Sequence, residues 1–393
     1  MLRVLAAVVL SGRMVAITCI DDLQALARKR IPRAVFDYAN GGAYDELTLR
    51  RNRSALDAIE FRQRVMIDVS KRSLATTVLG EPWSMPVAIA PTGLTGLFHR
   101  DGEICGARAA AAAGVPFALS TLSICSIEDV AAACAKPFWF QIYLMKDRGF
   151  NAELVARALA ARCSALVLTV DLTVQGVRRR DVRNGLCVPP RLTMRNAFDM
   201  ATKPGWALGM LLGKRRSFGN LQEKLNAAGG LRTLSQWIAA QFDTSITWKE
   251  MEWLRARWPG KIIVKGILDA EDAKLACEAG VDALVVSNHG GRQLDGAPAS
   301  ITVLPEIVAA VAGRTEVLFD GGVRCGQDVL KALAFGARAC LIGKSFLYAL
   351  AAMGEPGVRL ALDIIAKELD VSMGLAGVTD VRNVSRDILR PAR

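Results

Sequence analysis

The stretch that decides the fold is KIIVKGILDAEDAKLACEAGVDALVVSNH, residues 261–289. It opens on a nearly continuous apolar run, continues through an alanine-rich segment from Asp269 to Gly280, and closes on a second apolar run. Continuous apolar runs are typical of parallel strands that are buried on both faces. An aspartate before a helix and a glycine after it are ordinary capping residues. The stretch therefore predicts a strand–helix–strand unit of a parallel sheet.

The same alternation recurs along the chain from about residue 84. Eight apolar runs qualify as strands, at 85–93, 116–121, 138–144, 165–171, 261–266, 283–289, 316–322 and 340–345. Helical patterns separate most of them, for example at 102–114, 126–135 and 326–337. Eight strands that alternate with helices predict an α/β fold of the (β/α)8 TIM-barrel type. A doubly wound open sheet is the alternative, because strand count does not establish closure.

Three segments lie outside this alternation. Residues 14–80 precede the first barrel strand, and we expect an N-terminal helical segment that plugs or flanks the barrel. Residues 172–260 form a long insertion after the fourth strand, and loops of this length are usually functional or mobile. Residues 1–13 are interpreted as a non-native or disordered extension, because Met14 precedes the helix signal DDLQALARKR. Residues 14–393 are then one domain.

Composition narrows the class of protein. Of the 393 residues 52% are hydrophobic, so a large core can form, and the net charge of +12 is spread along the chain. We find no nucleic-acid-binding module. The nine cysteines include no C-x-x-C pair, which argues against a disulfide framework and a zinc site and favours a reducing compartment. The longest uncharged stretch, 109–127, is divided by Gly114 and Pro116 and predicts no spanning helix.

Polar residues or glycines stand at the ends of all eight predicted strands. In a TIM barrel these ends converge on one mouth, where the chemistry of the fold takes place. Eight such ends predict a site for a large polar ligand together with a substrate. The residues are Thr92, Ser120, Gln141, Tyr143, Thr169, Asp171, Lys265, Ser287, His289, Asp320, Gly321, Gly322, Gly343 and Lys344.

Two of these strand ends indicate a phosphate-binding site. FDGGVR (319–324) and LIGKS (341–345) are glycine-rich turns in which backbone N–H groups can approach an anion, and Arg324 and Lys344 add positive charge. Either turn alone fits an ordinary glycine-rich loop equally well, but the pair on the last two strands favours phosphate. Lys265 ends an apolar strand, so it needs an anionic partner, either a ligand atom or a core carboxylate.

His289 ends the opening stretch, and Arg292 follows three residues later within SNHGGRQLDG, residues 287–296. An imidazole can act as a base near neutral pH, and a guanidinium can bind a carboxylate with two hydrogen bonds. A lone strand-end histidine is more often structural. Asp171 and Tyr143 on other strand ends shift the interpretation toward catalysis, with Asp171 orienting the imidazole. The chain's other histidine, His99, is interpreted as a loop residue.

With these motifs, the chain resembles the FMN-dependent 2-hydroxy-acid dehydrogenases and oxidases, a family of TIM-barrel flavoenzymes. The resemblance runs from about residue 16 to the end. It rests on FDYANGGAYDE, IAPTG, FWFQIY, LTVD, IIVKGI, SNHGGRQLDG, DGGVR and IGKS, in that order. The segment 242–258, FDTSITWKEMEWLRARW, is most similar to the bacterial L-lactate dehydrogenase branch, whose members reduce quinones or cytochromes.

The resemblance implies a role for each site residue and FMN as the cofactor, with no metal. His289 would be the base, with Asp171 stabilising its protonated form and Tyr143 contacting the substrate hydroxyl. Tyr38, Arg178 and Arg292 would hold the substrate carboxylate, and Lys265 would act beside the flavin. The remaining cofactor-binding residues would be Pro91, Thr92, Gly93, Ser120, Gln141, Thr169, Ser287, Asp320, Gly321, Gly322, Val323, Arg324, Gly343 and Lys344.

The chain departs from the family at several positions. Lys344 stands where many members have arginine, which keeps the charge and loses the bidentate fork. Gly93 replaces a frequent alanine. Leu122 replaces the pocket tryptophan of plant glycolate oxidases, which argues against a glycolate-specific oxidase and leaves the side-chain pocket undefined. We expect no heme domain before the barrel.

The insertion contains KPGWALGMLLGKRRSFGN, residues 203–220. An apolar run beside a basic cluster suits a membrane interface, although an ordinary solvated lid is the alternative. We therefore expect peripheral membrane contact through 203–218, at the cytoplasmic face of the inner membrane, and electron transfer to a quinone or cytochrome. The predicted substrate is L-lactate, and the resemblance implies a homotetramer. The alternatives are a soluble oxidase that makes hydrogen peroxide, a mandelate-type dehydrogenase, a flavin-dependent isomerase and a non-catalytic membrane-associated binding protein.

Overall fold

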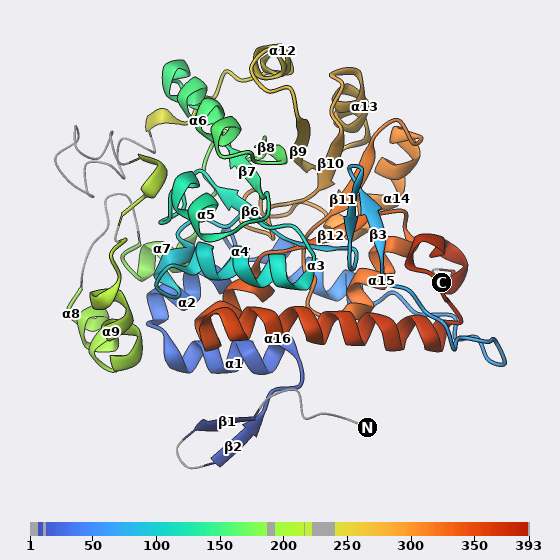
Figure 1. The fold of residues 1–393 in the computed structure, drawn as a ribbon, viewed down its shortest axis with the longest axis horizontal. Helices are drawn as coiled ribbons and strands as arrows, with labels where there is room; N and C mark the ends of the chain where they lie inside the picture. Colours follow the sequence, from blue (N-terminus) through green and yellow to red (C-terminus); the bar gives the residue numbers. More distant parts are fainter. Residues whose placement is uncertain (1–6, 11–12, 187–192, 216, 222–239, 392–393) are drawn as a thin grey trace.

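The computed structural model describes residues 7–10, 13–186, 193–215, 217–221 and 240–391 (Figure 1). Eight parallel strands form one sheet in the order β5-β12-β11-β10-β9-β8-β7-β6. A parallel bridge between Ile89 and Phe117 joins β5 to the segment that enters β6 and so closes the barrel. The strands are β5 (Val87–Ile89), β6 (Ala118–Ser120), β7 (Trp139–Ile142), β8 (Ala165–Thr169), β9 (Lys261–Ile267), β10 (Ala283–Val286), β11 (Glu316–Phe319) and β12 (Ala339–Ile342).

Small and β-branched side chains fill the barrel interior. They include Ala88, Val167 and Ile263, all fully buried. The antiparallel hairpin of β3 (Thr76–Val78) and β4 (Glu81–Trp83) covers the N-terminal end of the barrel. There Trp83 packs against Trp139 with ring centroids 5.7 Å apart. Because this end is filled by side chains, the open end of the barrel is the one at which the strands terminate.

Helices surround the sheet and complete the predicted alternation. Several begin as their sequences predict: Ser126 caps α5 through Asp129 N–H, and Asp269 caps α13 through Glu271 N–H. The long α16 is kinked at Gly354, where the backbone is non-helical and two helical segments meet. The helices are α4 (Gly102–Ala113), α5 (Ile127–Ala133), α6 (Arg148–Ala160), α12 (Glu250–Arg255), α13 (Ala270–Glu278), α14 (Ser300–Val311), α15 (Gly326–Ala334) and α16 (Lys344–Ala376).

The N-terminal segment is helical, as predicted. It contains α1 (Ile20–Arg30), α2 (Arg33–Asn40) and α3 (Leu47–Asp57), and α1 lies alongside α16 (Figure 1). Before α1, β1 (Ala7–Leu10) pairs with β2 (Arg13–Ala16). Residues 1–6 and 11–12 of the expected N-terminal extension lie outside the described residues. That residues 1–13 are an extension remains a prediction from the sequence.

The insertion after β8 carries α7 (Arg179–Arg183), α8 (Met194–Ala201), α9 (Pro204–Leu212) and a short 3-10 helix, η2 (Gly219–Leu221). In Figure 1, α8 and α9 project from one side of the barrel. Closure of the eight-stranded sheet confirms the TIM-barrel prediction, with its N-terminal helical segment and long insertion, over the open sheet. None of the helices in the described part of the chain is long and apolar enough to cross a membrane.

Candidate active site

A cavity of about 320 Å³ opens at the C-terminal ends of the strands. Most of the residues that the sequence assigns to the site line it: Tyr38, Pro91, Thr92, Gly93, Ser120, Tyr143, Arg178, Lys265, His289, Arg292, Asp320, Gly321, Gly322, Val323, Arg324, Gly343 and Lys344. The other four, Gln141, Thr169, Asp171 and Ser287, are not part of this lining but are direct neighbours of residues that are. Gln141 and Ser287 hydrogen bond to Ser120 and Lys265, respectively. The structure thus brings the predicted residues together.

His289 follows β10 and projects into the cavity from the turn after Ser287 and Asn288. Its backbone is in the left-handed region, with φ of 58°, and its N–H donates to Ser287 Oγ at 3.0 Å. The ring Nδ1 lies 2.8 Å from Asp171 Oδ1. This contact fixes the ring so that its other nitrogen, Nε2, is the one free to take a proton from a bound molecule.

Asp171 reaches His289 because β9 bulges between them. The register of β10 against β9 shifts at Val285/Val286, which leaves Gly266 out of the ladder with φ of 115°. A Cβ at Gly266 would lie 2.7 Å from Asp171 Cβ. A side chain at this position would therefore displace the carboxylate that orients the base.

Burial and charge set the ionisation of this pair. Burial lowers the pKa of His289 below its ordinary value, and the opposing attraction of Asp171 does not overcome it. Burial alone would raise the pKa of Asp171, but the charges of His289 and Lys265 and the hydrogen bond from His289 outweigh it, so the Asp171 pKa is lowered. A neutral imidazole beside a carboxylate is a base that is ready to act near pH 7.

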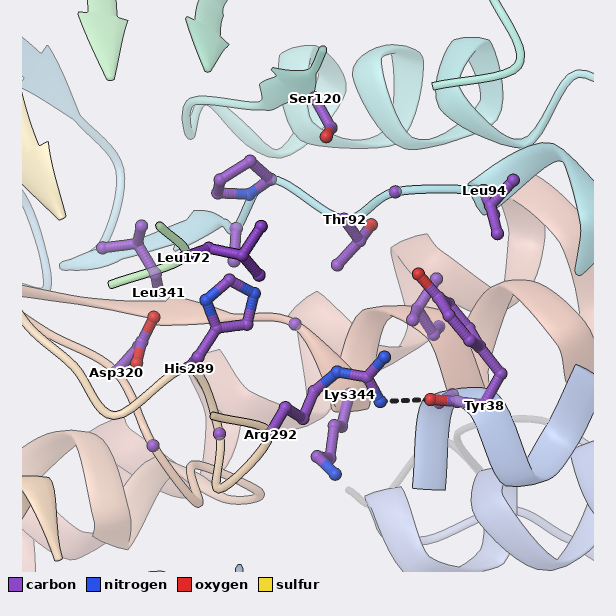
Figure 2. A pocket seen from close by; sticks show the side chains of 18 of the residues that line it. Tyr38, Thr92, Leu94, Ser120, Leu172, His289, Arg292, Asp320, Leu341 and Lys344 are labelled. Atoms are coloured by element: carbon purple, nitrogen blue, oxygen red, sulfur yellow. Dashed lines mark hydrogen bonds between the residues drawn. The ribbon is translucent and has the colours of Figure 1, made fainter. Parts of the chain in front are cut away.

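Arg292 and Arg178 place two guanidiniums at the same cavity. Arg292 stacks 4.7 Å over the Tyr38 ring and donates to the Tyr38 carbonyl (Figure 2). Arg178 Nε donates to the Arg292 carbonyl at 3.5 Å. Burial and the charge of Arg178 lower the pKa of Arg292 to about 10. In the hydrogen bonds of the described residues, both guanidiniums donate to backbone carbonyls. An incoming carboxylate would therefore relieve their mutual repulsion.

Lys265 is buried at the end of β9, and the structure gives it the core carboxylate that the sequence analysis considered as one of two partners. Its Nζ lies 2.7 Å from Asp320 Oδ2 and donates to Ser287 Oγ at 2.7 Å, so a core carboxylate does pair with it. Burial opposes its charge, but the attraction of Asp320 and Asp171 outweighs burial and raises the Lys265 pKa. Lys265 is therefore a fixed cation in the cavity wall.

Several buried polar atoms around the cavity have no hydrogen-bond partner within the described residues. They are Gln141 Nε2, Thr169 Oγ1 and Asp320 Oδ1. A buried donor or acceptor without a partner costs about 1–3 kcal/mol, so a bound ligand is expected to satisfy them. One amide donor and one hydroxyl suit a ring edge that both donates and accepts hydrogen bonds, and one carboxylate acceptor suits a chain that carries hydroxyl groups. The isoalloxazine and the ribityl chain of FMN have these features, and the three residues fit them.

The two glycine-rich turns that the sequence assigns to a phosphate both line the cavity. Gly321 and Gly322 take φ values of 113° and 92° in the turn after β11. Arg324 lines the cavity but also pairs with Asp21 of α1 at 2.9 Å. Lys344 donates to the carbonyls of Gly41 at 2.8 Å and Asn40 at 3.2 Å. Burial and the charge of Arg292 hold the Lys344 pKa well below its ordinary value, so a nearby anion would stabilise its ammonium.

Sequence reasoning missed several lining residues from outside the barrel, although the family resemblance did select Tyr38 of α2 and Arg178 of the insertion. Leu49, Asn52 and Arg53 belong to α3, which no strand-end rule selects. Phe242 comes from the end of the insertion, where a β-bridge between Met145 and Phe242 places its ring 5.8 Å from Tyr143, nearly edge-on. The resemblance of 242–258 to the family was a usable signal for Phe242.

Comparison with known proteins places this geometry in a family. Residues 27–391 match the model of the FMN-dependent dehydrogenases. The chain belongs to the FMN-dependent dehydrogenase family. Family membership and the cavity geometry together make the protein an FMN-dependent oxidoreductase that acts on 2-hydroxy acids, which confirms the cofactor, the fold and the reaction class predicted from the sequence.

Curated relatives in this family are L-lactate dehydrogenases. The chain is 49% identical to that of Caulobacter sp. (strain K31) over 374 residues, or 95% of this chain and 98% of the relative. It is 48% identical to that of Pseudomonas aeruginosa (strain UCBPP-PA14), with the same coverage of both chains. These identities confirm the resemblance to bacterial L-lactate dehydrogenases.

Solved structures of the same family share the fold. A monotopic membrane protein, (S)-mandelate dehydrogenase, superposes with a TM-score of 0.91 at 39% identity, covering 96% of this chain and all of that one. Mandelate oxidase superposes with a TM-score of 0.81 at 38% identity, covering 95% and 98% of the two chains. The isomerase and non-catalytic alternatives are set aside by this family membership.

Proposed function

We propose that this protein oxidises L-lactate to pyruvate and passes the electrons to the respiratory chain. The observation that carries the proposal is the His289–Asp171 pair, whose imidazole lines the same cavity as Arg178 and Arg292. Figure 2 shows His289 and Arg292 in this cavity. A base beside two carboxylate-binding cations is the arrangement that a 2-hydroxy acid requires, because the acid group orients the carbon that reacts.

FMN would be held by the residues with unsatisfied polar atoms and by the glycine-rich turns. Gln141, Thr169, Ser120, Ser287 and Lys265 would face its ring, with the backbone of Pro91, Thr92 and Gly93. The 320–324 turn, Gly343 and Lys344 would hold the ribityl chain and phosphate. When bound, FMN supplies the two-electron acceptor that amino-acid side chains lack.

The chain's own residues bind the substrate and move its proton. Arg292 and Arg178 bind the carboxylate, with the Tyr38 ring stacked against Arg292. The Tyr143 hydroxyl binds the substrate hydroxyl, and its raised pKa keeps it protonated as a donor. His289 Nε2 takes the proton, and Asp171 stabilises the imidazolium that results. The proton leaves either C2 or the hydroxyl.

L-lactate is proposed over mandelate because the curated relatives with 46–50% identity carry the name L-lactate dehydrogenase. Mandelate is the second candidate, since the solved structures named for it are 38–40% identical. The test is a panel of 2-hydroxy acids in both enantiomers, scored by anaerobic bleaching of bound flavin. Fastest bleaching by L-lactate supports the proposal, and fastest bleaching by (S)-mandelate would replace it.

Membrane association is proposed from the insertion. Met194 and Phe198 of α8 are 88% and 74% exposed, and three leucines of α9, Leu208, Leu211 and Leu212, are 57%, 67% and 62% exposed. Apolar side chains presented together in this way suit an interfacial contact. We place the contact at the 203–218 segment, on the cytoplasmic face of the inner membrane. The acceptor would be a quinone or a cytochrome, and the protein a homotetramer.

The acceptor proposal has a direct test against the soluble-oxidase alternative. With L-lactate under air, a dehydrogenase should reduce an artificial dye or a quinone and release little hydrogen peroxide. Stoichiometric peroxide with no dye reduction would replace the proposal with an oxidase.

A further inference from the structure

The turn that is proposed to hold the FMN phosphate is supported from behind by α3, a helix outside the barrel alternation. A Cβ on Gly322 would lie 2.9 Å from the Asn52 carbonyl oxygen, so α3 is in direct contact with the backbone of the turn. Gly322 also has a positive φ, which favours glycine. The position of the turn therefore depends on the residues of α3 that contact it.

Arg53 of α3 contacts this turn in two ways, through the carbonyl of Gly322 and through the side chain of Asp328. Its Nη1 donates to the Gly322 carbonyl at 2.9 Å and to Asp328 Oδ2 at 2.6 Å. Its Nη2 donates to Asp328 Oδ1 at 2.7 Å, which completes a bidentate pair. The Asp328 side chain is 1% exposed and that of Arg53 27% exposed, so the pair is largely shielded from water.

Asp328, at the start of α15, holds the other end of the same turn. Its Oδ2 accepts from Arg324 N at 2.9 Å and from Cys325 N at 3.2 Å. The ion pair with Arg53 offsets the negative charge of Asp328 close to the proposed phosphate. Together, the two side chains fix residues 322–325 from their carbonyl and amide sides at once.

The nitrogen atoms of Arg53 are all engaged within the protein. Nε and Nη2 also donate to Asp57 Oδ1, at 2.9 and 2.6 Å. Arg53 lines the cavity, yet its guanidinium is directed to Asp57, Asp328 and Gly322. Its contribution to ligand binding is then to hold the turn in place.

We infer that Arg53 and Asp328 form a clamp that positions the 320–324 turn for the phosphate of FMN, and that they are positioning residues for the cofactor. The inference rests on the proposed placement of the phosphate at this turn. Because the clamp acts on the phosphate end, it should contribute to the affinity for FMN and contribute little to the affinity for riboflavin, which has the same ring and no phosphate.

The experiment measures dissociation constants of FMN and riboflavin for the apoprotein by flavin fluorescence. Arg53→Lys keeps the charge and loses the bidentate fork, and Asp328→Asn is the second variant. We expect affinity for FMN to fall about tenfold or more, the usual weight of charge-assisted hydrogen bonds, while riboflavin affinity is unchanged. Riboflavin binding also shows that each variant is folded. The matched control is Arg72→Lys, which breaks a similar bidentate pair with Asp370.

Two results would overturn the clamp. One is unchanged FMN affinity in both variants, and the other is an equal loss for FMN and riboflavin, which a general loss of stability would produce. Arg324→Gln separates the clamp from the proposal on which it rests. If Arg324→Gln leaves the preference for FMN intact, the phosphate placement fails. If it removes the preference while Arg53→Lys keeps it, the clamp alone fails.

Discussion

Nδ1 of His289 lies 2.8 Å from Oδ1 of Asp171, across 118 residues of sequence. The two side chains follow β10 and β8, which are separated in the barrel by β9 and its Lys265. The bulge at Gly266 lets the contact pass over the intervening strand. Three adjacent strands of the barrel, β10, β9 and β8, thus position the base His289, the buried cation Lys265 and the carboxylate Asp171.

The first prediction concerns the pH dependence of substrate oxidation. His289 acts in its neutral form, so kcat/KM should be flat near pH 7 and fall as pH drops through the His289 pKa, which burial lowers below its ordinary value. The charge of Asp171 raises the His289 pKa against burial, so Asp171→Asn should move this fall to lower pH. The same variant should lower kcat by about 10²–10⁴-fold, since the imidazolium loses its partner.

Stopped-flow bleaching of the flavin between pH 5 and 8 provides the measurement, and His289→Gln is the reference variant. His289→Gln should keep bound FMN while its reduction by substrate is abolished. Normal bleaching in His289→Gln, or an acid limb that moves upward in Asp171→Asn, contradicts the assignment.

The second prediction concerns Arg292 as the carboxylate site. Arg292→Lys keeps a cation but loses the planar fork, so KM for L-lactate should rise roughly 10- to 100-fold. The bound flavin spectrum should be unchanged, because Arg292 is assigned to the substrate. Arg179→Lys, at a surface pair with Asp45, is the control. A KM that stays within about twofold of the parent value would remove Arg292 from the carboxylate site.

The barrel and most of the site were predictable because both follow from short-range sequence patterns. A continuous apolar run followed by a polar residue marks a strand and its end, and the fold itself brings such ends together, as at Lys265, Asp320 and His289. The contributions of Arg53 and Phe242 were not predictable in this way. Each reaches the site by tertiary packing, one from a helix before the barrel and one from the end of the insertion.

Ion pairs also could not be assigned from sequence. Arg215 belongs to the basic cluster that was predicted to face a membrane, yet it bridges Asp101 and Asp129 at 2.6 and 2.7 Å. Trp206 of the same segment donates to the Leu97 carbonyl at 2.7 Å. Both residues anchor the segment to the barrel. The local sequence pattern would look the same if their side chains faced solvent or a membrane instead.

The third prediction concerns selectivity for the substrate side chain. Phe242 lies edge-on to Tyr143 in the cavity wall, and its position is fixed by the backbone bridge to Met145. Phe242→Leu should therefore enlarge the cavity and leave the backbone in place. We expect the ratio of kcat/KM for (S)-mandelate to that for L-lactate to rise about tenfold, within the range that pocket size alone provides.

Phe198→Leu, an exposed aromatic of α8, is the control for this change and should leave the ratio as it was. Should the ratio stay constant in Phe242→Leu as well, the side-chain pocket lies elsewhere in the cavity. Leu122, which stands beside Gly93, would then be the next wall to enlarge.

The last prediction concerns the membrane contact. Because Trp206 and Arg215 anchor the 203–218 segment to the barrel, deleting the segment would disturb both the anchor and the apolar surface. Replacing Leu208, Leu211 and Leu212 by serine removes much of the exposed apolar surface and retains Trp206 and Arg215. Losing three leucines from an interfacial contact costs on the order of several kcal/mol, so binding to anionic lipid vesicles should fall by about 100-fold or more.

Vesicle co-sedimentation gives the bound fraction, and anaerobic bleaching by L-lactate shows that the site is intact in the triple variant. Leu375→Ser, a leucine of α16 that is 57% exposed, is the matched control and should sediment like the parent protein. Each cation near an anionic surface adds about 1 kcal/mol, so salt should weaken the parent's binding through the cations of the segment. Equal sedimentation of the triple variant and the parent would mean that α9 is not the membrane contact, even if the protein binds vesicles.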